Sequence, residues 1–581
     1  MELTRFDGYA LYRTLIAGAK RLIGERMALN KINVFPVADG DTGSNLSFQM
    51  QTIIDESKPG DTVSATMESI ASAAMSGSRG NSGIIFTEYL NGLYETLKGK
   101  VVATLDDFAA AVKSGVKKAY LALAKPVEGT ILTVLRKAFL VEAKHATINE
   151  YIAKSYERAK VALIETTSEL EVLRINGVVD AGAQGFTVFL EGMHHYLSTG
   201  ESEIIVAPDS GSFIAVTHGE SIEERYCTEA ILIDADGEPA AIRAAFAADG
   251  SSVIVAGRRD RMRIHIHTDR PDLVFQKLAQ HGRIAEQKVD DMVRQLEALA
   301  PDRPAVAIVT DSIADLPAAM MDDLQIHMLP IGLLADGTAY LDKVTISAAT
   351  FYDLMKTAKE TSSSQPSTKQ IARLLDFLGE HYRDILVFTV SGAMSGTSAA
   401  VRQYAENHAN VTVFDTLLNS GAQGLVVRKA AELARNGVSA AEILRDITAF
   451  RDRTKIYVGV ATLKYMVKQG RISKMTGLAA KILNMKPVVS IDEQGKGSIL
   501  HKAFSRRGAF RYILDLVAAK PVENYAVVHA GAPDLARKIA ADCRKATGKE
   551  PLYIDSISPI VAMNAGIGAV AVAVTYAEGG N

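Results

Sequence analysis

The amino-acid sequence predicts a multi-domain fold in which an all-α N-terminal region is followed by two α/β regions. Helical periodicity of apolar residues runs from residue 1 to about 200, and short β-type runs occupy about 201–300. After the proline-bracketed stretch APDRP, β-runs alternate with helical segments, a pattern typical of α/β units. A chain of 581 residues also exceeds a single domain of roughly 100–200 residues, so we expect two to four domains.

The composition is that of a soluble globular protein, with 48% hydrophobic residues, 23% charged residues and a net charge of −3. No basic excess indicates nucleic-acid binding. The first residues, MELTRFDGYALYR, lack the apolar segment of a signal peptide, and runs such as AVAVAV fall short of the ~20 residues that span a bilayer. The two cysteines, Cys227 and Cys543, suit a reducing compartment. We therefore expect a cytoplasmic protein.

The N-terminal region combines amphipathic helices with glycine-rich polar loops. Helices are expected over 12–27, 44–54, 66–77, 105–123 and 151–167. The loops are NVFPVADGDTGSN (33–45), SGSRGNSG (76–83), KPVEGTILT (125–133) and NGVVDAGAQG (176–185). One such loop is usually a helix cap, but four in one helical region suggest a common pocket at one end of a helical barrel.

The first loop has the chemistry of a magnesium and phosphate site. Asp39 and Asp41 are one residue apart and can point to the same side of an extended backbone. Hydroxyl and amide side chains follow where the next helix begins, and a helix N-terminus is a natural phosphate site. Hard oxygen ligands are what Mg²⁺ prefers. A calcium loop or a plain Asx-turn is the alternative, although the spacing does not fit an EF-hand.

In the middle region, strands are expected over 202–207, 227–234, 251–257 and 261–268. A two-residue period in RMRIHIHTD places Arg261, Arg263, His265 and His267 on one face of the last strand. Met262, Ile264 and Ile266 then lie on the other face. By itself this pattern is an ordinary polar sheet face, and two arginines disfavour a cation.

The third region is expected to form α/β units on a mostly parallel sheet. Its β-runs lie at 305–310, 385–390, 411–416, 455–462, 525–531 and 552–557. Hydroxyl-rich loops follow several of them, at 309–317, 362–367, 391–398 and 469–474. Each loop alone is typical of a turn or a helix N-cap.

The four N-terminal loops, in this order, resemble the nucleotide-binding domain shared by the L subunit of dihydroxyacetone kinases and by bacterial fatty acid kinases. The NVFP lead and the KPVEGT loop are more similar to the fatty acid kinase branch. The resemblance implies an all-helical up-and-down barrel that binds ATP through Mg²⁺, and a homodimer formed through this domain. Asp39 and Asp41 would be the metal ligands, and Asn33 lies near the place of a further aspartate in glycerone kinases.

The same resemblance assigns the remaining nucleotide contacts. Those expected to hold phosphates are Thr42, Ser44, Asn45, Ser82, Gly83 and Thr130. Asp180 and Gly182 would shape the nucleotide site. The central domain of the fatty acid kinases is known for a zinc held by one cysteine and an HxH pair. Cys227, His265 and His267 match that arrangement, for which we expect a structural role.

The loops of residues 304–581 resemble the DegV family, whose members bury an acyl chain between two α/β lobes. Ser363, Ser364 and Ser395 match the hydroxyls that meet the fatty-acid carboxylate, and Arg471 would face the transferred phosphate. The family usually has a histidine in a closing GxHxGPGA segment. This chain reads AMNAGIGA, with Asn564 in the place of the histidine, and asparagine cannot titrate.

Together the resemblances imply a kinase domain (1–200), a connecting domain (201–302) and a fatty-acid-binding domain (303–581) in one chain. The expected reaction converts ATP and a bound fatty acid into ADP and an acyl phosphate, with peripheral exchange at membrane lipid-synthesis enzymes left open. Two alternatives remain at this point. One is a kinase for a small hydroxylated metabolite with a regulatory lipid-binding domain, and the other is a non-catalytic lipid-binding protein.

Overall fold

The computed structural model describes residues 3–38, 40–141, 147–202, 222–470 and 485–579. The chain divides into two compact units, one of residues 1–270 and 277–296 and the other of residues 271–276 and 297–581. Within the described residues, no helix is long and apolar enough to cross a membrane.

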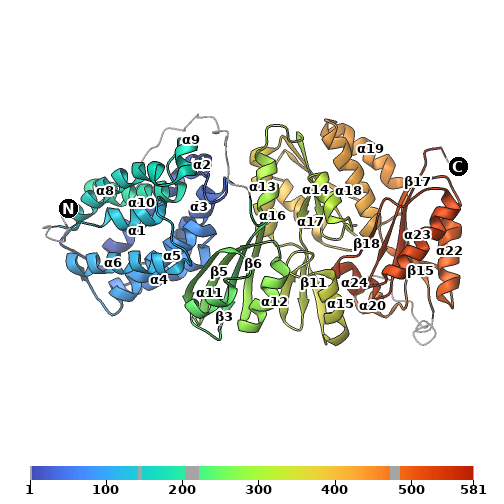
Figure 1. The fold of residues 1–581 in the computed structure, drawn as a ribbon, viewed down its shortest axis with the longest axis horizontal. Helices are drawn as coiled ribbons and strands as arrows, with labels where there is room; N and C mark the ends of the chain where they lie inside the picture. Colours follow the sequence, from blue (N-terminus) through green and yellow to red (C-terminus); the bar gives the residue numbers. More distant parts are fainter. Residues whose placement is uncertain (1–2, 39, 142–146, 203–221, 471–484, 580–581) are drawn as a thin grey trace. The chain divides into compact units, whose positions relative to one another are not determined.

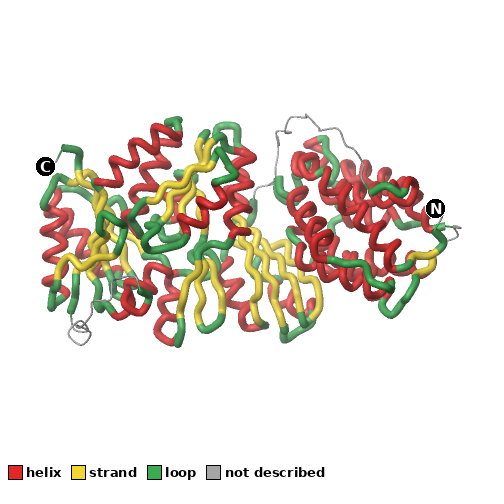
Figure 2. The backbone as a smooth tube through the Cα atoms, turned by 180° about the vertical axis from the view of Figure 1, so that it is seen from behind, coloured by secondary structure: helices red, strands yellow, loops and turns green. Residues whose placement is uncertain are grey.

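Helices make up most of the first 200 residues (Figures 1 and 2). They are α1 (Gly8–Gly24), α2 (Arg26–Lys31), α3 (Thr42–Glu56), α4 (Val63–Gly77), α5 (Gly80–Leu97), α6 (Leu105–Ala122), α7 (Ile131–Ala138), α8 (Ile148–Glu169), α9 (Glu171–Asn176) and α10 (Ala181–Thr199). Two short strands, β1 (Arg5–Phe6) and β2 (Ala103–Thr104), pair antiparallel. The starts of the helices follow local chemistry, because Thr62 and Thr147 cap α4 and α8, and Thr104 and Asp107 form a capping box on α6.

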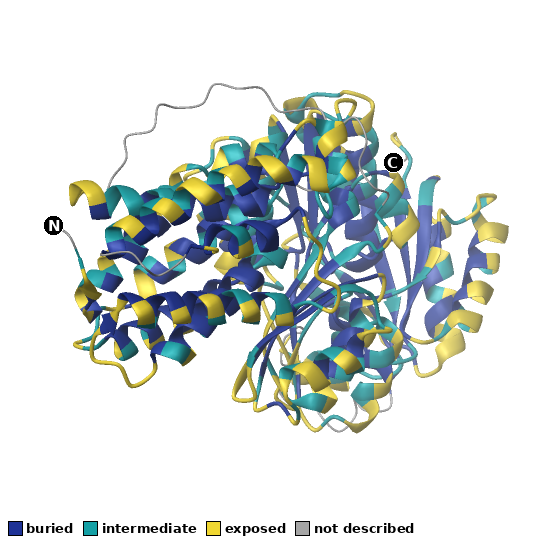
Figure 3. Ribbon diagram, turned by 60° about the vertical axis from the view of Figure 1, so that its left-hand side comes forward, coloured by how far each residue is buried: buried dark blue, intermediate teal, exposed yellow. Residues whose placement is uncertain are grey.

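Eight of these helices contact one another in a closed cycle, in the order α1, α3, α4, α5, α6, α7, α8, α10 and back to α1. The buried residues lie on the faces that the helices turn toward one another, and the exposed residues lie on the outer faces (Figure 3). Glycines allow the closest approaches, since a Cβ atom at Gly92 of α5 would lie 2.5 Å from the Cα of Gly115 in α6.

An aromatic cluster fills the centre of this core. The ring of Phe86 is fully buried and meets Phe186 edge-on at 5.7 Å and Phe189 at 5.0 Å between centroids. Such pairs add a small stabilisation to that of the buried area.

The middle region forms an antiparallel four-stranded sheet in the order β4-β5-β3-β6. Its elements are β3 (Tyr226–Ile233), α11 (Pro239–Phe246), β4 (Ser251–Arg258), β5 (Arg261–Thr268), α12 (Pro271–His281), β6 (Arg283–Asp291) and α13 (Met292–Leu299). Met262, Ile264 and Ile266 are buried, but Arg263, His265 and His267 are buried as well, so both faces of β5 are covered and its burial does not alternate. The expected strand at 202–207 lies almost wholly outside the described residues.

The described residues of the second unit form three sheets. Its first half comprises β7 (Val306–Asp311), α14 (Ala318–Asp323), β8 (His327–Leu329), β9 (Gly332–Ala335), β10 (Thr338–Leu341), α15 (Ala348–Thr357), β11 (Thr361–Ser364), α16 (Thr368–His381), β12 (Asp384–Thr389), α17 (Thr397–Ala405) and β13 (Val411–Asp415). Its second half comprises α18 (Ser420–Arg435), α19 (Ala440–Asp452), β14 (Thr454–Gly459), α20 (Lys464–Lys468), β15 (Val488–Ile491), β16 (Gly497–His501), α22 (Arg506–Ala518), β17 (Val522–His529), α23 (Pro533–Thr547), β18 (Ile554–Ser556), α24 (Pro559–Ala565) and β19 (Val570–Tyr576).

The expectation of a mostly parallel sheet is right for one of these sheets and wrong for another. The sheet β13-β12-β7-β8 is parallel throughout. In the six-stranded sheet β16-β15-β14-β19-β17-β18 only β17 and β18 pair in parallel. The reason is that β19 inserts antiparallel between β14 and β17, and β15 and β16 form a hairpin. Alternation of strands and helices does not fix the direction in which a strand joins a sheet.

The aromatic core of the helical region generates a stability prediction. Phe86→Ala should lower the free energy of unfolding of this region by about 3–5 kcal/mol, because it leaves a cavity among the rings. Ile164→Ala serves as the control, since that side chain is 71% exposed and its loss should cost no more than about 0.5 kcal/mol. Urea titrations followed by far-UV circular dichroism compare the two, and equal losses would contradict the assigned core.

Candidate functional site

The first turns of three helices of the N-terminal region are in direct contact. Asn45 of α3 packs on Gly80 of α5, where an added Cβ atom would lie 2.8 Å from Asn45 Nδ2. Ser82 of α5 packs on Gly182 of α10 in the same way, with a Cβ atom 2.5 Å from Ser82 Oγ. Gly80 has a φ of +62°, which favours glycine at the turn into α5.

Asp180 brings in a fourth helix, α7. It precedes α10 and accepts a hydrogen bond from the backbone N–H of Ala183 at 2.7 Å, and the backbone N–H of Ile131 at the start of α7 lies near the same carboxylate. Thr130, the residue before Ile131, caps α7 and accepts from the N–H of Leu132 at 3.3 Å. Four helix N-termini therefore meet at one end of this region, and their N–H groups together favour a bound anion.

The loop before α3 holds the predicted metal ligands. Asp39 lies outside the described residues. Asp41 directly precedes α3 and its carboxylate makes no capping bond to the helix. Asn33 accepts a hydrogen bond from the Thr42 hydroxyl. The backbone N–H of Ser44 donates to Asn30 Oδ1 at 3.0 Å.

The loop before α5 and the first turn of that helix contain polar atoms with unmet hydrogen-bonding capacity. Ser78 Oγ and Asn81 Oδ1 are buried, and no hydrogen-bond partner for either is found among the described residues. Buried polar atoms without partners are rare in native proteins, so this loop is suited to a polar ligand. The Gly83 carbonyl, by contrast, accepts from Gln49 Nε2 at 2.9 Å.

Arg79 in the same loop is a cation that the sequence reasoning did not single out. Its guanidinium carbon lies 3.3 Å from the ring centroid of Phe48 in α3. Burial lowers the pKa of Arg79 to about 10, and the nearby carboxylates of Glu229, Glu286 and Asp41 oppose this effect. The side chain therefore stays charged at neutral pH. Its place within SGSRGNSG was the available signal.

The middle sheet brings together Cys227, His265 and His267, whose candidate ligand atoms all lie within 4.8 Å of one another. Strand register explains the cluster, because Cys227 of β3 lies directly opposite His267 of β5. All three side chains are buried. Burial, followed by the neighbouring His265, lowers the pKa of His267 to about 3, so this ring is neutral and can bind a metal.

The donor set fits zinc. Its members are one sulfur and two imidazoles, and His265 Nε2 is buried without a hydrogen-bond partner among the described residues. Of the two arginines that disfavoured a cation, Arg263 is paired, with its Nη2 2.8 Å from Glu229 Oε2, and Arg261 is exposed.

Glu229 is a second residue that the sequence reasoning missed. It is fully buried next to the cluster, with Oε1 3.4 Å from His265 Nδ1 and 3.4 Å from Lys288 Nζ. Burial raises the pKa of Glu229, but the charges of Lys288 and Arg263 outweigh it and hold the pKa well below its usual range. Its spacing of two from Cys227 on one strand was the signal that could have found it.

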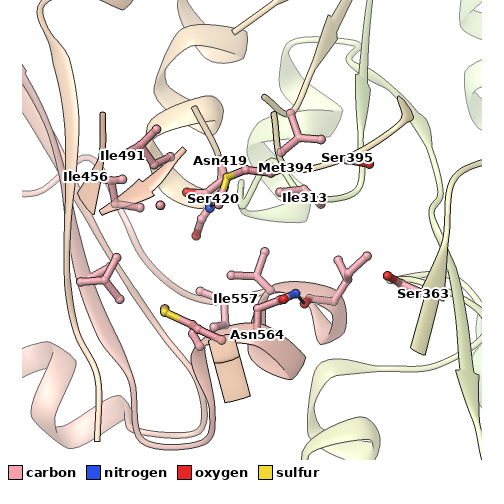
Figure 4. Close-up of a pocket in the computed structure, with 18 of the residues that line it drawn as sticks. Ile313, Ser363, Met394, Ser395, Asn419, Ser420, Ile456, Ile491, Ile557 and Asn564 are labelled. Carbon is pink, nitrogen blue, oxygen red and sulfur yellow. Dashed lines mark hydrogen bonds between the residues drawn. The ribbon is translucent and has the colours of Figure 1, made fainter. Parts of the chain in front are cut away.

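The second unit contains a cavity with an empty volume of about 1170 Å³, its open mouth included. Its walls are mainly aliphatic, and no charged side chain of the described residues lines it. One wall comes from neighbouring positions of three strands, where Ala571 of β19 pairs with Val458 of β14 and with Val528 of β17. Ile456 and Ile491 lie at one side of the cavity, and Ser363 and Ser395 at the other (Figure 4).

All four predicted substrate-binding residues line this cavity: Ser363, Ser364, Ser395 and Asn564. The first two lie on β11, and Ser395 bonds to the hydroxyl of Thr397 at 2.9 Å in the turn before α17. Asn564 donates from Nδ2 to the Ile560 carbonyl at 2.8 Å, and no partner for its buried Oδ1 is found among the described residues. Arg471 lies outside the described residues.

A buried acidic network supports one side of the cavity. Ser420, which lines the cavity, donates to Asp315 Oδ2 at 2.6 Å, and Lys343 Nζ lies 3.1 Å from the other oxygen. Asp342 accepts from the hydroxyl of Ser312 at 2.7 Å, and burial raises the pKa of Asp342 to about 7. Asp315 of VTDSIADLP and the more distant Asp342 therefore lie behind the wall of the cavity.

The position of Asp180 predicts a pH dependence. Burial raises its pKa to about 6, above the value of about 3.9 for an unfolded chain. A raised carboxyl pKa means that its stabilising contribution is lost as the pH rises from about 4 to about 6. Asp180→Asn keeps the cap and cannot titrate, so between pH 4 and 7 its free energy of unfolding should gain up to about 3 kcal/mol relative to the wild type. Urea titrations at both pH values test this, and a difference that does not change with pH would contradict it.

Three family models match successive parts of the chain. The DAK2 domain matches residues 36–195. The middle domain of FakA-like fatty acid kinases matches residues 223–299, and the DegV family model matches residues 305–577.

Individual relatives match parts of the chain as well. It is 30% identical over 318 residues to Protein YloV of Bacillus subtilis (strain 168), and this match covers 51% of this chain and 57% of YloV. It is 27% identical over 272 residues to the DegV domain-containing protein SAR1438 of Staphylococcus aureus (strain MRSA252), covering 46% of this chain and 97% of that one. The chain thus spans little more than half the length of YloV.

Among solved structures, the fatty acid binding DegV family protein SAG1342 from Streptococcus agalactiae is 28% identical with a TM-score of 0.44, covering 47% of this chain and 99% of that one. DegV, a fatty acid binding protein from Bacillus subtilis, is 26% identical with a TM-score of 0.44, covering 47% of this chain and 100% of that one. From the three family models, this chain joins a DAK2 domain, a middle domain of the FakA-like fatty acid kinase type and a DegV-family domain in one polypeptide.

Proposed function

We propose that this chain uses ATP to phosphorylate the carboxylate of a bound fatty acid, giving an acyl phosphate. The observation that carries the proposal is the uncharged aliphatic cavity with hydroxyl groups at one side, in the same polypeptide as a kinase-type DAK2 domain. The match of the middle region to a fatty acid kinase model supports the same acceptor.

The nucleotide would bind where the four helix N-termini meet. Ser82, Gly83 and Thr130, with Thr42, Ser44 and Asn45, would donate to its phosphates, and Asp180 and Gly182 would shape the site. Asp39 and Asp41, with Asn33 beside them, would hold Mg²⁺, which neutralises charge on the phosphates when bound. The closed cycle of helices supports the barrel that the sequence resemblance implies.

The acceptor would place its chain against the aliphatic walls and its carboxylate among Ser363, Ser364 and Ser395. A fatty acid has a pKa near the ~4.3 of glutamate, so it is already ionised at neutral pH and needs no general base. The reaction then depends on positioning and charge neutralisation, for which Arg471 is the expected residue. Asn564 can donate a hydrogen bond to the carboxylate without titrating.

The character of the cavity also bears on the alternatives. A kinase for a small hydroxylated metabolite would need a polar interior, whereas the walls here are aliphatic. In the middle domain, Cys227, His265 and His267 would hold a structural zinc.

Substitution of the metal ligand tests the kinase part. Asp41→Ala should lower formation of acyl phosphate from ATP, trapped as the hydroxamate, by at least about 100-fold, because a carboxylate ligand of the metal is lost. Native mass spectrometry should still find the bound fatty acid. Asp55→Ala is the matched control, since Asp55 is an exposed carboxylate at the other end of α3. Equal formation of acyl phosphate in both variants would rule out Asp41 as a metal ligand, and no acyl phosphate from the wild type would favour a non-catalytic lipid-binding protein.

Filling the cavity tests the acceptor. Ala571→Phe places a ring between Val458 and Val528, so the purified protein should lose its fatty acid in denaturing extraction and mass spectrometry. Leu500→Phe, at a side chain that is 43% exposed on β16, should retain it. The absence of a fatty acid from the wild type as well would return the hydroxylated-metabolite kinase to consideration.

A further inference from the structure

We propose that Glu229 is a positioning residue that couples the Cys227–His265–His267 site to the nucleotide site through the N-terminus of α5. The inference rests on the proposed function for the location of the nucleotide site. It adds a route by which metal binding in the middle domain sets the affinity for ATP.

One end of the route is the contact between Glu229 and the metal cluster. Strand register places Glu229 of β3 directly opposite His265 of β5 and opposite Lys288 of β6. Glu229 Oε1 lies 3.4 Å from His265 Nδ1. A histidine that binds a metal through one ring nitrogen usually donates a hydrogen bond from the N–H of the other to a carboxylate, and this bond fixes the orientation of both groups. Metal binding at His265 therefore restrains the carboxylate of Glu229.

The other end is the first turn of α5. The backbone N–H of Gly80 donates to the same Oε1 atom of Glu229 at 2.7 Å, across 149 residues of sequence. Arg79, the residue at the N-cap position, makes no side-chain capping bond, so the cap of α5 comes from the middle domain. Two residues further on, Ser82 packs against Gly182 of α10. A shift of the Glu229 carboxylate thus acts on the turn that carries the expected phosphate contacts.

The surrounding contacts are continuous enough to transmit such a shift. Ile84 of α5 and Ala122 of α6 share a buried apolar cluster with Ile254 and Ala256 of β4. On the same face, Glu88 of α5 accepts a hydrogen bond from the N–H of Gly257 at 3.0 Å. Packed side chains and hydrogen bonds of this kind carry coupling between sites.

Glu88 provides a matched control for Glu229. Both are buried carboxylates that accept a hydrogen bond from a backbone N–H and join α5 to the middle sheet. Glu88 lies eight residues beyond Gly80, and in the described contacts it does not touch the metal cluster. If these two carboxylates only hold α5 against the middle sheet, Glu229→Gln and Glu88→Gln should change nucleotide binding in the same way.

The experiment measures binding of the non-hydrolysable ATP analogue AMP-PNP with Mg²⁺ to full-length protein, loaded with Zn²⁺ or stripped by 1,10-phenanthroline. In the wild type and in Glu88→Gln, stripping should raise the Kd at least about 5-fold, the lower end of usual coupling between sites. In Glu229→Gln the loaded and stripped proteins should bind with the same Kd. Equal zinc dependence in Glu229→Gln and the wild type, or none in the wild type, overturns the coupling. Failure of the zinc-loaded wild type to bind AMP-PNP overturns the proposed nucleotide site itself.

Hydrogen exchange of the wild type tests the coupling without any variant. Removal of Zn²⁺ should speed exchange in the peptide that carries Gly80 and leave the peptide that carries Gly257 unchanged, because only the first N–H is held by Glu229. Equal exchange of the Gly80 peptide with and without Zn²⁺ overturns the proposal even if Glu229→Gln does not fold.

Discussion

The buried carboxylate of Asp180, which lies near the starts of two helices, defines the end of the helical region where the candidate site lies. A buried carboxylate is costly unless donors surround it; the N–H of Ala183 in α10 donates to it, and the N–H of Ile131 in α7 lies nearby. Both groups can lie near one carboxylate only if the two helices begin at the same place. Ser82 and Asn45 extend this meeting point to α5 and α3 through glycines that leave no room for a side chain. The anion-binding capacity of the site is therefore a consequence of how the helices are joined.

The polar face of the middle sheet also depends on one buried carboxylate that is surrounded by donors. A face with arginine, lysine and two histidines can be buried only because Glu229 accepts from several of them at once. Its remaining capacity goes to the Gly80 N–H of the helical region. The carboxylate that allows this face to be buried is thus also the one that joins the middle sheet to the loop before α5.

In the second unit the buried carboxylates lie behind the site and not in it. Asp315 and Asp342 lie behind the wall of the cavity, where serine hydroxyls and backbone N–H groups satisfy them, and the lining itself is left uncharged. A long apolar ligand gains from contact with such a wall, whereas a charged lining would have to be desolvated. The hydroxyls of Ser363 and Ser395 at one side can donate hydrogen bonds to an ionised headgroup.

Much of this could be predicted from local patterns. Periodicity predicted helices such as α6, because it reflects which face a helix buries, and it also located β5, although that strand is buried on both faces. The match of the glycine and serine loops to known motifs predicted residues that do lie together, including Ser363 and Asn564 on one cavity. Strand direction in the six-stranded sheet was not predictable, because the insertion of β19 between β14 and β17 depends on long-range pairing.

By itself, the sequence determined the order of the three regions, the chemistry of their loops and the alternation that places His265 and His267 on one face of their strand. These properties depend on residue type and on short spacings. Only the tertiary structure decided which distant groups meet. Glu229 caps a helix that begins 149 residues earlier, and the carboxylate of Asp180 lies near the start of α7, about 50 residues away in the sequence. Such partners are selected by the need to satisfy buried polar groups in three dimensions, and that need leaves no local signature in the chain.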